Sequence, residues 1–411
     1  MLKNYLKLSL KILARRKFFT FVSLFGIGFT LLVLTLSAAM LDHIFAPYAP
    51  ETRADRTLTV YSIRLQNGDG SSTGPGGYGL YDKYLRDLPG VERMAISSMP
   101  ATVVSYWKGA RIEALLRRTD ADYFRILDFG FLEGAPYGQV DVAESRLVAV
   151  INETTRRKYF GAAQAVGQMI EADGQSFKVV GVVPDVPIFR AVSMGDIYVP
   201  VTTAKSDDYK NKIRGGYTAL FLLKDQDLAD SVRQEFKARL TKVELPPQFN
   251  KIYAVPESFF ASFARMFIND FEADEPGDRL MAIFLTIAAL FMILPAVNLV
   301  NLNVSRALER SSEIGVRRAF GASARDLLLQ FLFENVIISV VGGVLALAAA
   351  AAVLAVLNQS EIIPYAHFAL NLRIVAWGFL FALAFGVISG VWPAWRLSRL
   401  KPINALAGGS R

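Results

Sequence analysis

Four long stretches without a charged side chain constrain the fold of this sequence more than any other feature. They cover residues 18–41, 280–304, 335–360 and 374–395. A helix rises about 1.5 Å per residue, so about 20 apolar residues span the roughly 30 Å hydrocarbon core of a bilayer. We therefore predict four transmembrane helices over these stretches, and we extend the third to 327–360 across the single charge of Glu334.

The first stretch could also be compared with a cleavable signal peptide, because three basic residues precede it. The apolar core of a signal peptide is typically about 7–15 residues long. The stretch at 18–41 contains 24 residues. We therefore interpret it as an uncleaved membrane anchor.

The distribution of charge predicts the orientation of these helices. Residues 1–17 carry a net charge of +6, residues 305–326 carry +2 and residues 396–411 carry +4. Basic segments beside transmembrane helices stay on the cytoplasmic side. We therefore expect both termini and the 305–326 segment in the cytoplasm, and residues 43–278 outside. Since the whole chain has a net charge of +8, the rest is slightly acidic, which argues against a nucleic-acid partner.

The composition also limits the chemistry of the chain. There is no cysteine, and the two histidines, His43 and His367, lie far apart in the sequence. Disulfides, thiolate catalysis and cysteine metal sites are thereby excluded. Asp120 and Asp122 are close together, but no nucleophile or base accompanies them, and we interpret them as solvated turn or helix-cap residues. The sequence predicts no catalytic residue, no metal site and no bound cofactor.

Residues 43–278 predict a folded α+β domain of two lobes. Strand–helix–strand patterns occur near each end, at 56–65, 80–88 and 91–99, and at 217–223, 228–243 and 250–255. Two such units suggest a split β-α-β sandwich assembled from both ends, with a β-rich lobe inserted at about 110–203. The glycine-rich residues 66–79 lack the lysine of a phosphate-binding loop and predict a flexible hairpin or lid loop.

The segment between the second and third spans predicts a short helix at the membrane surface. Charges of both signs alternate with apolar residues, and Glu313 stands four positions before Arg317, the favourable order for an ion pair. Gly321 is a suitable residue to end such a helix. From these residues alone, an interfacial helix with a solvated charged face is the simplest interpretation.

Several residues within the spans depart from a plain apolar helix. Asn298 and Asn301 lie three positions apart in the second span, where they either contact a neighbouring helix or form a hinge. Glu334 lies near the cytoplasmic edge of the third span, where it either anchors the helix or contributes to coupling. The third span is longer than a bilayer core is thick, and Gly342-Gly343 is its expected weak point.

Several motifs together resemble one known family. They are Glu309-Arg310, Glu313-Ile314-Gly315, Arg317-Arg318-Ala319, Gly321-Ala322, Gly342-Gly343 and Pro393-Ala394-Trp395-Arg396. This set resembles the MacB/FtsX-type permeases of ABC transporters, the macrolide-exporter-like type VII group. In the outer domain, Asp122-Tyr123-Phe124 and Val179-Val180-Gly181 are similar to that family's periplasmic core domain. The sequence departs from the family at Lys401 and Asn404, where acidic residues are usual.

The resemblance implies a machine of several chains. It implies a dimer of four-span subunits, either identical copies or paralogues, with ABC ATPase subunits that bind ATP and Mg²⁺. The 305–326 segment would be the coupling helix on the ATPase, through Glu309, Arg310, Glu313, Ile314, Arg317, Arg318, Phe320 and Gly321. The family's macrolide exporter carries a fused ATPase domain. Here the first span follows 17 residues and no GxxxxGK[S/T] motif occurs, so we expect a separate ATPase chain.

Three functional hypotheses follow. The resemblance favours a permease of the bacterial inner membrane that exports a drug, peptide, lipoprotein or similar cargo from the periplasm by mechanotransmission. A periplasmic adaptor and an outer-membrane channel are further candidate partners, besides the lipid bilayer. A second hypothesis is a transmembrane transmitter that regulates periplasmic partners such as cell-wall hydrolases and exports nothing. A membrane-anchored enzyme is the third, which the lack of a catalytic constellation disfavours.

Overall fold

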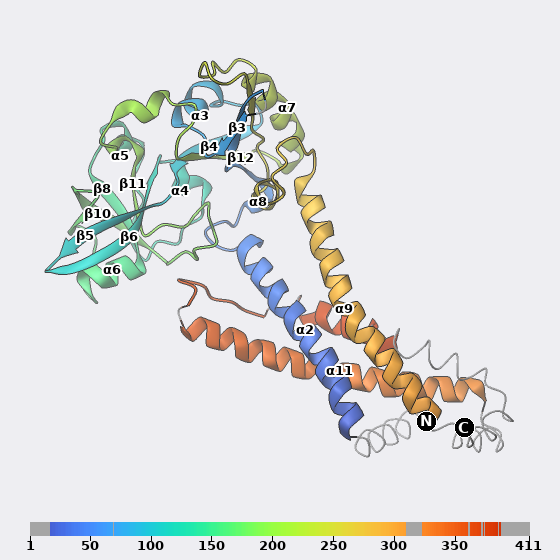
Figure 1. Ribbon diagram of the computed structural model, residues 1–411. Coiled ribbons are helices and arrows are strands. Elements are labelled where there is room, and N and C mark those ends of the chain that lie inside the picture. Colours follow the sequence, from blue (N-terminus) through green and yellow to red (C-terminus); the bar gives the residue numbers. More distant parts are fainter. Residues whose placement is uncertain are drawn as a thin grey trace. The chain divides into compact units, whose positions relative to one another are not determined.

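The computed structural model describes residues 17–68, 70–309, 323–360, 362–370, 373, 375–384 and 386–387. These residues form two compact units (Figure 1). The helical unit comprises the described residues up to His43, those from Ile283 to Ile362 and those from His367 onward. The α/β unit comprises Ile44–Ala282 together with Ile363–Ala366.

Long apolar helices make up the helical unit. They are α2 (Lys17–Phe45), α9 (Pro276–Glu309) and α11 (Ala324–Ser360). Among the described residues, three segments are long and apolar enough to cross a membrane, namely Thr20–Phe45, Pro276–Ile293 and Leu332–Ser360. A shorter apolar helix covers Val375–Ala384. Because the rest of that region lies outside the described residues, the fourth span at 374–395 stays a prediction.

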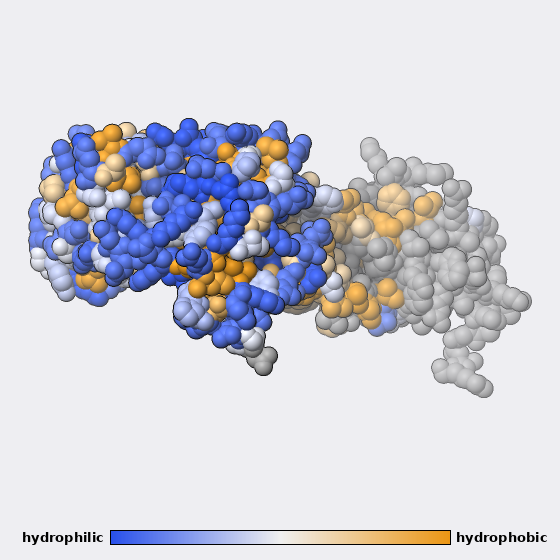
Figure 2. All heavy atoms as spheres, turned by 90° about the horizontal axis from the view of Figure 1, so that it is seen from above, coloured by the Kyte–Doolittle hydropathy of each residue, from blue (hydrophilic) through white to orange (hydrophobic). Residues whose placement is uncertain are grey.

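The surfaces of the two units differ in polarity. Figure 2 shows a mainly hydrophilic α/β unit, whereas the described helices carry hydrophobic side chains on their surface. On α2, Phe18 is 73% exposed and Phe21 is 66% exposed, and on α9 Leu285 is 62% exposed. Contiguous apolar surface of this kind is favourable against lipid and unfavourable in water.

The α/β unit is built on one large mixed sheet. Among the described residues it contains ten strands, in the order β1-β12-β4-β6-β11-β8-β10-β7, with β5 beside β6 and β9 beside β10. Their bounds are β1 (Thr57–Val60), β4 (Val91–Ser98), β5 (Ala101–Trp107), β6 (Ala110–Thr119), β7 (Glu133–Gly134), β8 (Val148–Asn152), β9 (Met169–Ala172), β10 (Gln175–Val183), β11 (Ile197–Pro200) and β12 (Tyr217–Leu223). A second sheet joins β13 (Lys251–Tyr253), β2 (Ile63–Asn67) and β3 (Gly70–Gly74).

Short helices accompany the sheets. They are α3 (Tyr78–Tyr84), α4 (Tyr123–Ile126), α5 (Gln139–Ala143), α6 (Glu153–Phe160), α7 (Ala229–Leu240) and α8 (Phe259–Ile268), with 3-10 turns η1 (Ala54–Arg56), η2 (Val201–Thr203), η3 (Asp207–Asn211) and η4 (Gln226–Leu228). The helix predicted at 228–243 is confirmed as α7, and its Val232, Phe236 and Leu240 are buried at the spacing of four residues that is typical of a core-facing helix.

The strand β12 lies between β1 and β4 and runs antiparallel to both. All of its residues from Thr218 to Leu223 are buried, which explains the continuous apolar run that predicted this strand. Since β1 and β4 are each antiparallel to β12, they run parallel to one another. With α3 between them in the chain, they form the predicted split β-α-β unit.

Two predicted strands are placed differently. The expected strand at 56–65 is two strands, β1 and β2, which belong to different sheets. Leu58 and Val60 are buried in the same core as Ile63 and Leu65. Alternation places every second residue on one face, so a continuous strand could not bury both pairs, and the chain breaks between them. The predicted second β-α-β unit also differs, because β13 pairs with β2 in the small sheet.

The glycine-rich segment 66–79 is a hairpin, but much of it is closely packed. Residues Gly70–Gly74 form β3 and pair with β2. A Cβ atom on Gly77 would lie 1.9 Å from the carbonyl oxygen of Lys212, and one on Gly79 would lie 2.6 Å from that of Lys210. These glycines therefore permit close backbone approach, and the predicted hairpin is confirmed by the pairing of β2 with β3.

Three buried clusters line the described part of the α/β unit, and one of them joins Ala95 and Leu220 with Val150 and Tyr198. A second cluster contains Leu58 and Phe236 and draws on both ends of the domain. The third contains Phe177 and Val199, and its buried residues lie between Ile112 and Val199, with Val103 and Trp107 packed against them. The pair Ser97 and Thr119 joins β4 to β6, so the sheet is continuous across these clusters. The fold is thus a mixed α/β domain.

Candidate functional site

The chain enters the α/β unit directly after α2 and is held there by a buried arginine. Arg190 is 2% exposed. Its Nη2 donates to the carbonyl oxygen of Ala46 at 3.0 Å, and its Nη1 donates to Oε2 of Glu51 at 3.0 Å. We call Arg190, Glu51 and Ser193 the N-terminal clamp. Removing either partner of such a buried ion pair destabilises the fold, because the remaining charge would lack compensation.

Glu51 is held through both carboxylate oxygens. Its Oε1 accepts a hydrogen bond from Oγ of Ser193 at 2.5 Å, while Oε2 accepts from Arg190. Burial raises the pKa of Glu51, and the hydrogen bond from Ser193 and the charge of Arg190 oppose that rise. The carboxyl group of Glu51 therefore loses its hydration on folding and gains hydrogen bonds from Ser193 and Arg190 in exchange.

A second buried arginine fixes the loop that carries this clamp. Arg117, on β6, is 0% exposed. Its Nε donates to the carbonyl oxygen of Met194 at 2.9 Å, its Nη1 to that of Val192 at 2.9 Å and its Nη2 to that of Ala191 at 2.7 Å. A guanidinium group has five N–H donors in a rigid plane, so it orders several carbonyl groups at once. The loop that bears Arg190 and Ser193 is thereby attached to the sheet.

A second clamp lies at the other connection, ahead of α9. Arg265 of α8 donates from Nε to Oε2 of Glu257 at 2.9 Å and from Nη2 to the carbonyl oxygen of Ala273 at 2.9 Å. The side chains of Arg265 and Glu257 are 6% and 5% exposed. We call this pair the C-terminal clamp. It ties the segment that leads into α9 back onto the domain.

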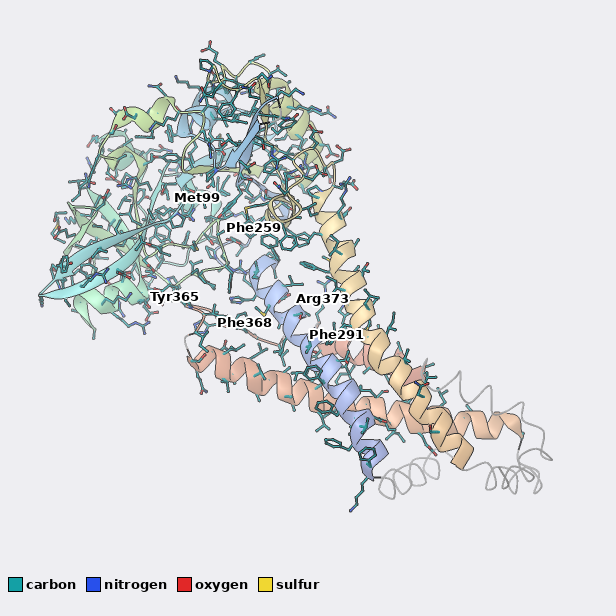
Figure 3. All side chains as sticks on the ribbon, viewed as in Figure 1. Met99, Phe259, Phe291, Tyr365, Phe368 and Arg373 are labelled. Carbon is teal, nitrogen blue, oxygen red and sulfur yellow. The ribbon has the colours of Figure 1, made fainter. Side chains whose placement is uncertain are left out.

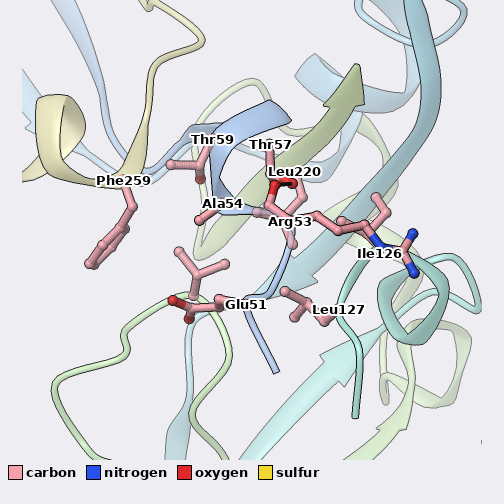
Figure 4. Close-up of a pocket in the computed structure, with 10 residues that line it drawn as sticks. Glu51, Arg53, Ala54, Thr57, Thr59, Ile126, Leu127, Leu220 and Phe259 are labelled. Atoms are coloured by element: carbon pink, nitrogen blue, oxygen red, sulfur yellow. Dashed lines mark hydrogen bonds between the residues drawn. The ribbon is translucent and has the colours of Figure 1, made fainter. Parts of the chain in front are cut away.

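The two connections meet at an aromatic cluster. Phe45, the last residue of α2, lies with its ring centroid 5.7, 5.0 and 5.5 Å from those of Phe259, Phe260 and Phe263 on α8. A small pocket lies beside the cluster, lined by Glu51, Arg53, Ala54, Thr57, Thr59, Ile126, Leu127, Val192, Leu220 and Phe259. Figure 4 shows Glu51 and Phe259, one from each connection, at this pocket. The start and the end of the domain are thus packed together.

Small residues allow close contacts inside the helical unit. A Cβ atom on Gly342 of α11 would lie 3.1 Å from Cγ2 of Ile27 on α2, and one on Gly343 would lie 3.5 Å from Cβ of Ala382. Ile27, Ala382 and Ile338 belong to one buried cluster. α11 continues through both glycines as a helix, and small residues at such contacts let membrane helices approach closely.

The structure describes only some of the other predicted site residues. Glu334 is 4% exposed and lies on α11. Asn301 is exposed, and Asn298 lies within α9. Glu309 is the last residue of α9. The remaining predicted coupling residues lie outside the described residues, namely Arg310, Glu313, Ile314, Arg317, Arg318, Phe320 and Gly321. The coupling site stays a prediction.

Asp120 has a structural position. Its Oδ2 accepts a hydrogen bond from the backbone N–H of Ile96 at 2.8 Å and its Oδ1 accepts from that of Tyr123 at 3.1 Å. Burial raises the pKa of Asp120 to about 7. The interpretation of Asp120 as a solvated residue is wrong, because its side chain is buried and its carboxylate accepts hydrogen bonds from two backbone N–H groups. Among the described residues no cluster of histidine and carboxylate side chains could hold a metal ion.

The clamp residues escaped the sequence analysis. The chain has 45 lysine and arginine residues, and no local pattern separates Arg117 or Arg190 from the others. Arg265 did offer a signal, because it is the one charged residue in the apolar helix α8, FFASFARMFI. A lone charge on such a helix has to find a buried partner or reach water.

Apolar helices that can cross a membrane, with a clamped α/β domain between the first and the second in the sequence, define a membrane protein with an inserted α/β domain. Residues 20–239 match the MacB-like periplasmic core domain, and residues 285–402 match the FtsX-like permease C-terminal region. The chain belongs to the MacB/FtsX family of ABC transporter permeases.

Two curated relatives and one solved structure are similar to this chain. The macrolide export ATP-binding/permease protein MacB of Bdellovibrio bacteriovorus is 30% identical over 272 residues, which cover 63% of this chain and 38% of the relative. The uncharacterized ABC transporter permease YvrN of Bacillus subtilis is 27% identical over 289 residues, which cover 70% of this chain and 68% of YvrN. The crystal structure of the periplasmic region of MacB from Actinobacillus actinomycetemcomitans has 17% identity and a TM-score of 0.38, covering 52% of this chain and 93% of that one. The chain spans less than half of the length of the first curated relatives that it matches.

Proposed function

We propose that this chain is the transmembrane permease subunit of an ATP-driven mechanotransmission transporter, which moves a drug, peptide, lipoprotein or similar cargo out of the periplasm. The hydrolysis of ATP takes place in a separate ABC ATPase chain, which binds the ATP and Mg²⁺. The subunit lies in the bacterial inner membrane, with both termini in the cytoplasm and the α/β unit in the periplasm.

One observation carries the proposal, namely that both connections of the α/β unit converge on β1. The N-terminal clamp holds the residues just before η1, which leads directly into β1. On the other side, the backbones of Glu257 and Thr59 exchange two hydrogen bonds, at 2.7 and 3.1 Å. Because β1 is the edge strand of the large sheet, a displacement of α2 or α9 would reach the sheet at the same place.

Mechanical transmission needs stiff joints, and the clamps supply them. A flexible linker would absorb the movement of a membrane helix before it reached the domain. Buried ion pairs and carbonyl-bound guanidinium groups are fixed in geometry. The second protomer, a periplasmic adaptor and an outer-membrane channel complete the proposed machine.

A pull-down from the native membrane tests the ATPase partnership. The tagged chain is purified in detergent, the co-purifying proteins are identified and ATP hydrolysis is measured. In the predicted coupling segment, Ile314→Asp with Phe320→Asp should abolish recovery of a P-loop ATPase. The matched control is Leu132→Asp with Val140→Asp, which adds the same charge at residues that are 55% and 56% exposed in the α/β unit. This control should retain the ATPase.

Two results would contradict the proposal. Failure to recover an ATPase with well-folded wild-type protein would overturn the transporter assignment. Recovery of the ATPase together with unchanged efflux and a cell-envelope or division defect in a deletion strain would replace export by the regulatory transmitter function. Sensitivity to a drug, or retention of a periplasmic cargo, is the result expected for export.

A further inference from the structure

A third connection joins the α/β unit to the membrane helices, through the loop that follows α11. Residues Ile363–Ala366 of this loop belong to the α/β unit. The hydroxyl group of Tyr365 donates a hydrogen bond to Oδ1 of Asp196 at 3.0 Å. Figure 3 labels Tyr365 on this loop. The contact is non-covalent, whereas the connections to α2 and α9 are continuous chain.

Asp196 is a firmly held point of the large sheet. It is 6% exposed and directly precedes β11. Its Oδ2 accepts from the backbone N–H of Leu115 on β6 at 2.8 Å, and its Oδ1 accepts from Nδ2 of Asn152 on β8 at 2.8 Å. The backbone of Asp196 also bonds to Leu115 and Asn152. A force on this carboxylate is therefore passed to β6, β8 and β11 together.

The loop is also tied to α11, a few residues beyond Tyr365. Asn358 of α11 donates from Nδ2 to the carbonyl oxygen of Phe368 at 2.9 Å, and its Oδ1 accepts from the backbone N–H of Phe368 at 2.9 Å. Each residue of an extended chain spans at most about 3.6 Å. The stretch from Tyr365 to Phe368 is thus too short to absorb a large movement of α11.

The backbone of Tyr365 is held in an uncommon conformation. Its φ angle is 62°, in the left-handed region that residues with a bulky side chain rarely adopt. Such a conformation persists where surrounding contacts impose it, and it is concentrated in switch regions and binding clamps. This observation is independent of the hydrogen bond and points to the same residue.

We propose that Tyr365 and Asp196 form a latch that couples α11 to the periplasmic sheet, and that the latch opens and closes during the nucleotide cycle. The inference rests on the proposed function, because it assigns the latch to the same ATP-driven movement. The connections to α2 and α9 attach to the domain at β1, whereas the connection to α11 attaches to β6, β8 and β11 through Asp196. Closure would make the sheet follow α11, and opening would release it to move with α2 and α9 alone.

Hydrogen exchange on the full chain in lipid nanodiscs, purified with its ATPase, tests the latch. Tyr365→Phe removes only the hydroxyl group, and Tyr106→Phe, at a tyrosine that is 65% exposed on β5, is the matched control. We expect Tyr365→Phe to increase exchange several-fold in residues 363–368, where the amides of Ala366 and Phe368 are hydrogen-bonded. The control should match wild type. In wild type, exchange of this segment should differ between nucleotide-free and vanadate-trapped states, and Tyr365→Phe should remove that difference.

Each result separates the latch from the transporter assignment. Unchanged exchange of residues 363–368 in Tyr365→Phe would overturn the latch. Increased exchange in the variant, with no dependence on nucleotide in wild type, would overturn the switching role and leave a static support. Both results keep the proposed function if the ATPase co-purifies. Absence of any ATPase from wild-type preparations would overturn the proposed function and, with it, the coupling role of the latch.

Discussion

Glu257 and Thr59 pair through two backbone hydrogen bonds, although they stand at opposite ends of the α/β unit in the sequence. The side chain of Glu257 is at the same time bound by Arg265. One residue therefore links β1 to the segment that leads into α9. This double use of Glu257 brings the segment that leads into α9 to the same edge strand that follows η1.

The N-terminal clamp is expected to depend on both charged partners. Arg190→Met leaves the carboxylate of Glu51 buried without its cation, which should cost about 3–5 kcal/mol. Combining it with Glu51→Leu should restore part of that loss, because no uncompensated charge remains. Thermal unfolding of the full chain in detergent checks both variants. If Arg190→Met alone were as stable as Arg190→Met combined with Glu51→Leu, the role of the ion pair would be contradicted.

The glycine-rich hairpin is expected to tolerate no side chain at Gly77. A Cβ atom there would meet the carbonyl oxygen of Lys212 at 1.9 Å, so Gly77→Ala should shift the backbone and lower the stability by about 1–3 kcal/mol. Gly130→Ala is the control, because no atom lies within 4 Å of its Cβ position. The measurement is the unfolding midpoint in urea, and equal midpoints for the two variants would refute the argument.

The contact of α2 with α11 is expected to be sensitive at Gly342. Gly342→Val places side-chain atoms where a Cβ already lies 3.1 Å from Ile27, whereas the Cβ of Gly28→Ala meets its nearest atom at 3.7 Å. Overpacking of this kind typically costs about 1–3 kcal/mol, so the valine variant should unfold at a lower temperature in detergent. Gly28→Ala should unfold close to wild type. If Gly28→Ala unfolded at a lower temperature than Gly342→Val, the contact of α2 with α11 at Gly342 would be contradicted.

Asp120 is expected to make stability depend on pH. Burial raises its pKa to about 7 in the folded protein, against about 3.9 in an unfolded chain. The folded state therefore holds the proton more tightly, and this stabilisation is complete below about pH 4 and is lost as the pH rises through about 7. Relative to Asp120→Asn, which cannot ionise, wild type should lose thermal stability between pH 5 and pH 8. If the thermal stability of wild type and of Asp120→Asn varied with pH in the same way, the raised pKa of Asp120 would be contradicted.

Much of the fold could be predicted from local patterns. The strand predicted at 217–223 is β12, and the helix predicted at 228–243 is α7. The break between β1 and β2 was missed, because strand-forming residues continue from 56 to 65 in near alternation, although Leu58 and Ile63 are out of phase. Which of two sheets a strand joins depends on partners far away in the chain, and no local window contains them.

For the candidate site, the sequence determined less and the tertiary structure decided more. Length and hydropathy of the sequence determined that the chain has helices able to cross a membrane, since the cost of exposing apolar residues to water depends on composition alone. Only the tertiary structure decided that Arg117, Arg190 and Arg265 are buried and that Tyr365 meets Asp196. A buried charge is stable only where distant carbonyl and carboxylate oxygens converge on it. That convergence is a property of the folded chain, so an arginine in a clamp and an arginine in water look the same in the sequence.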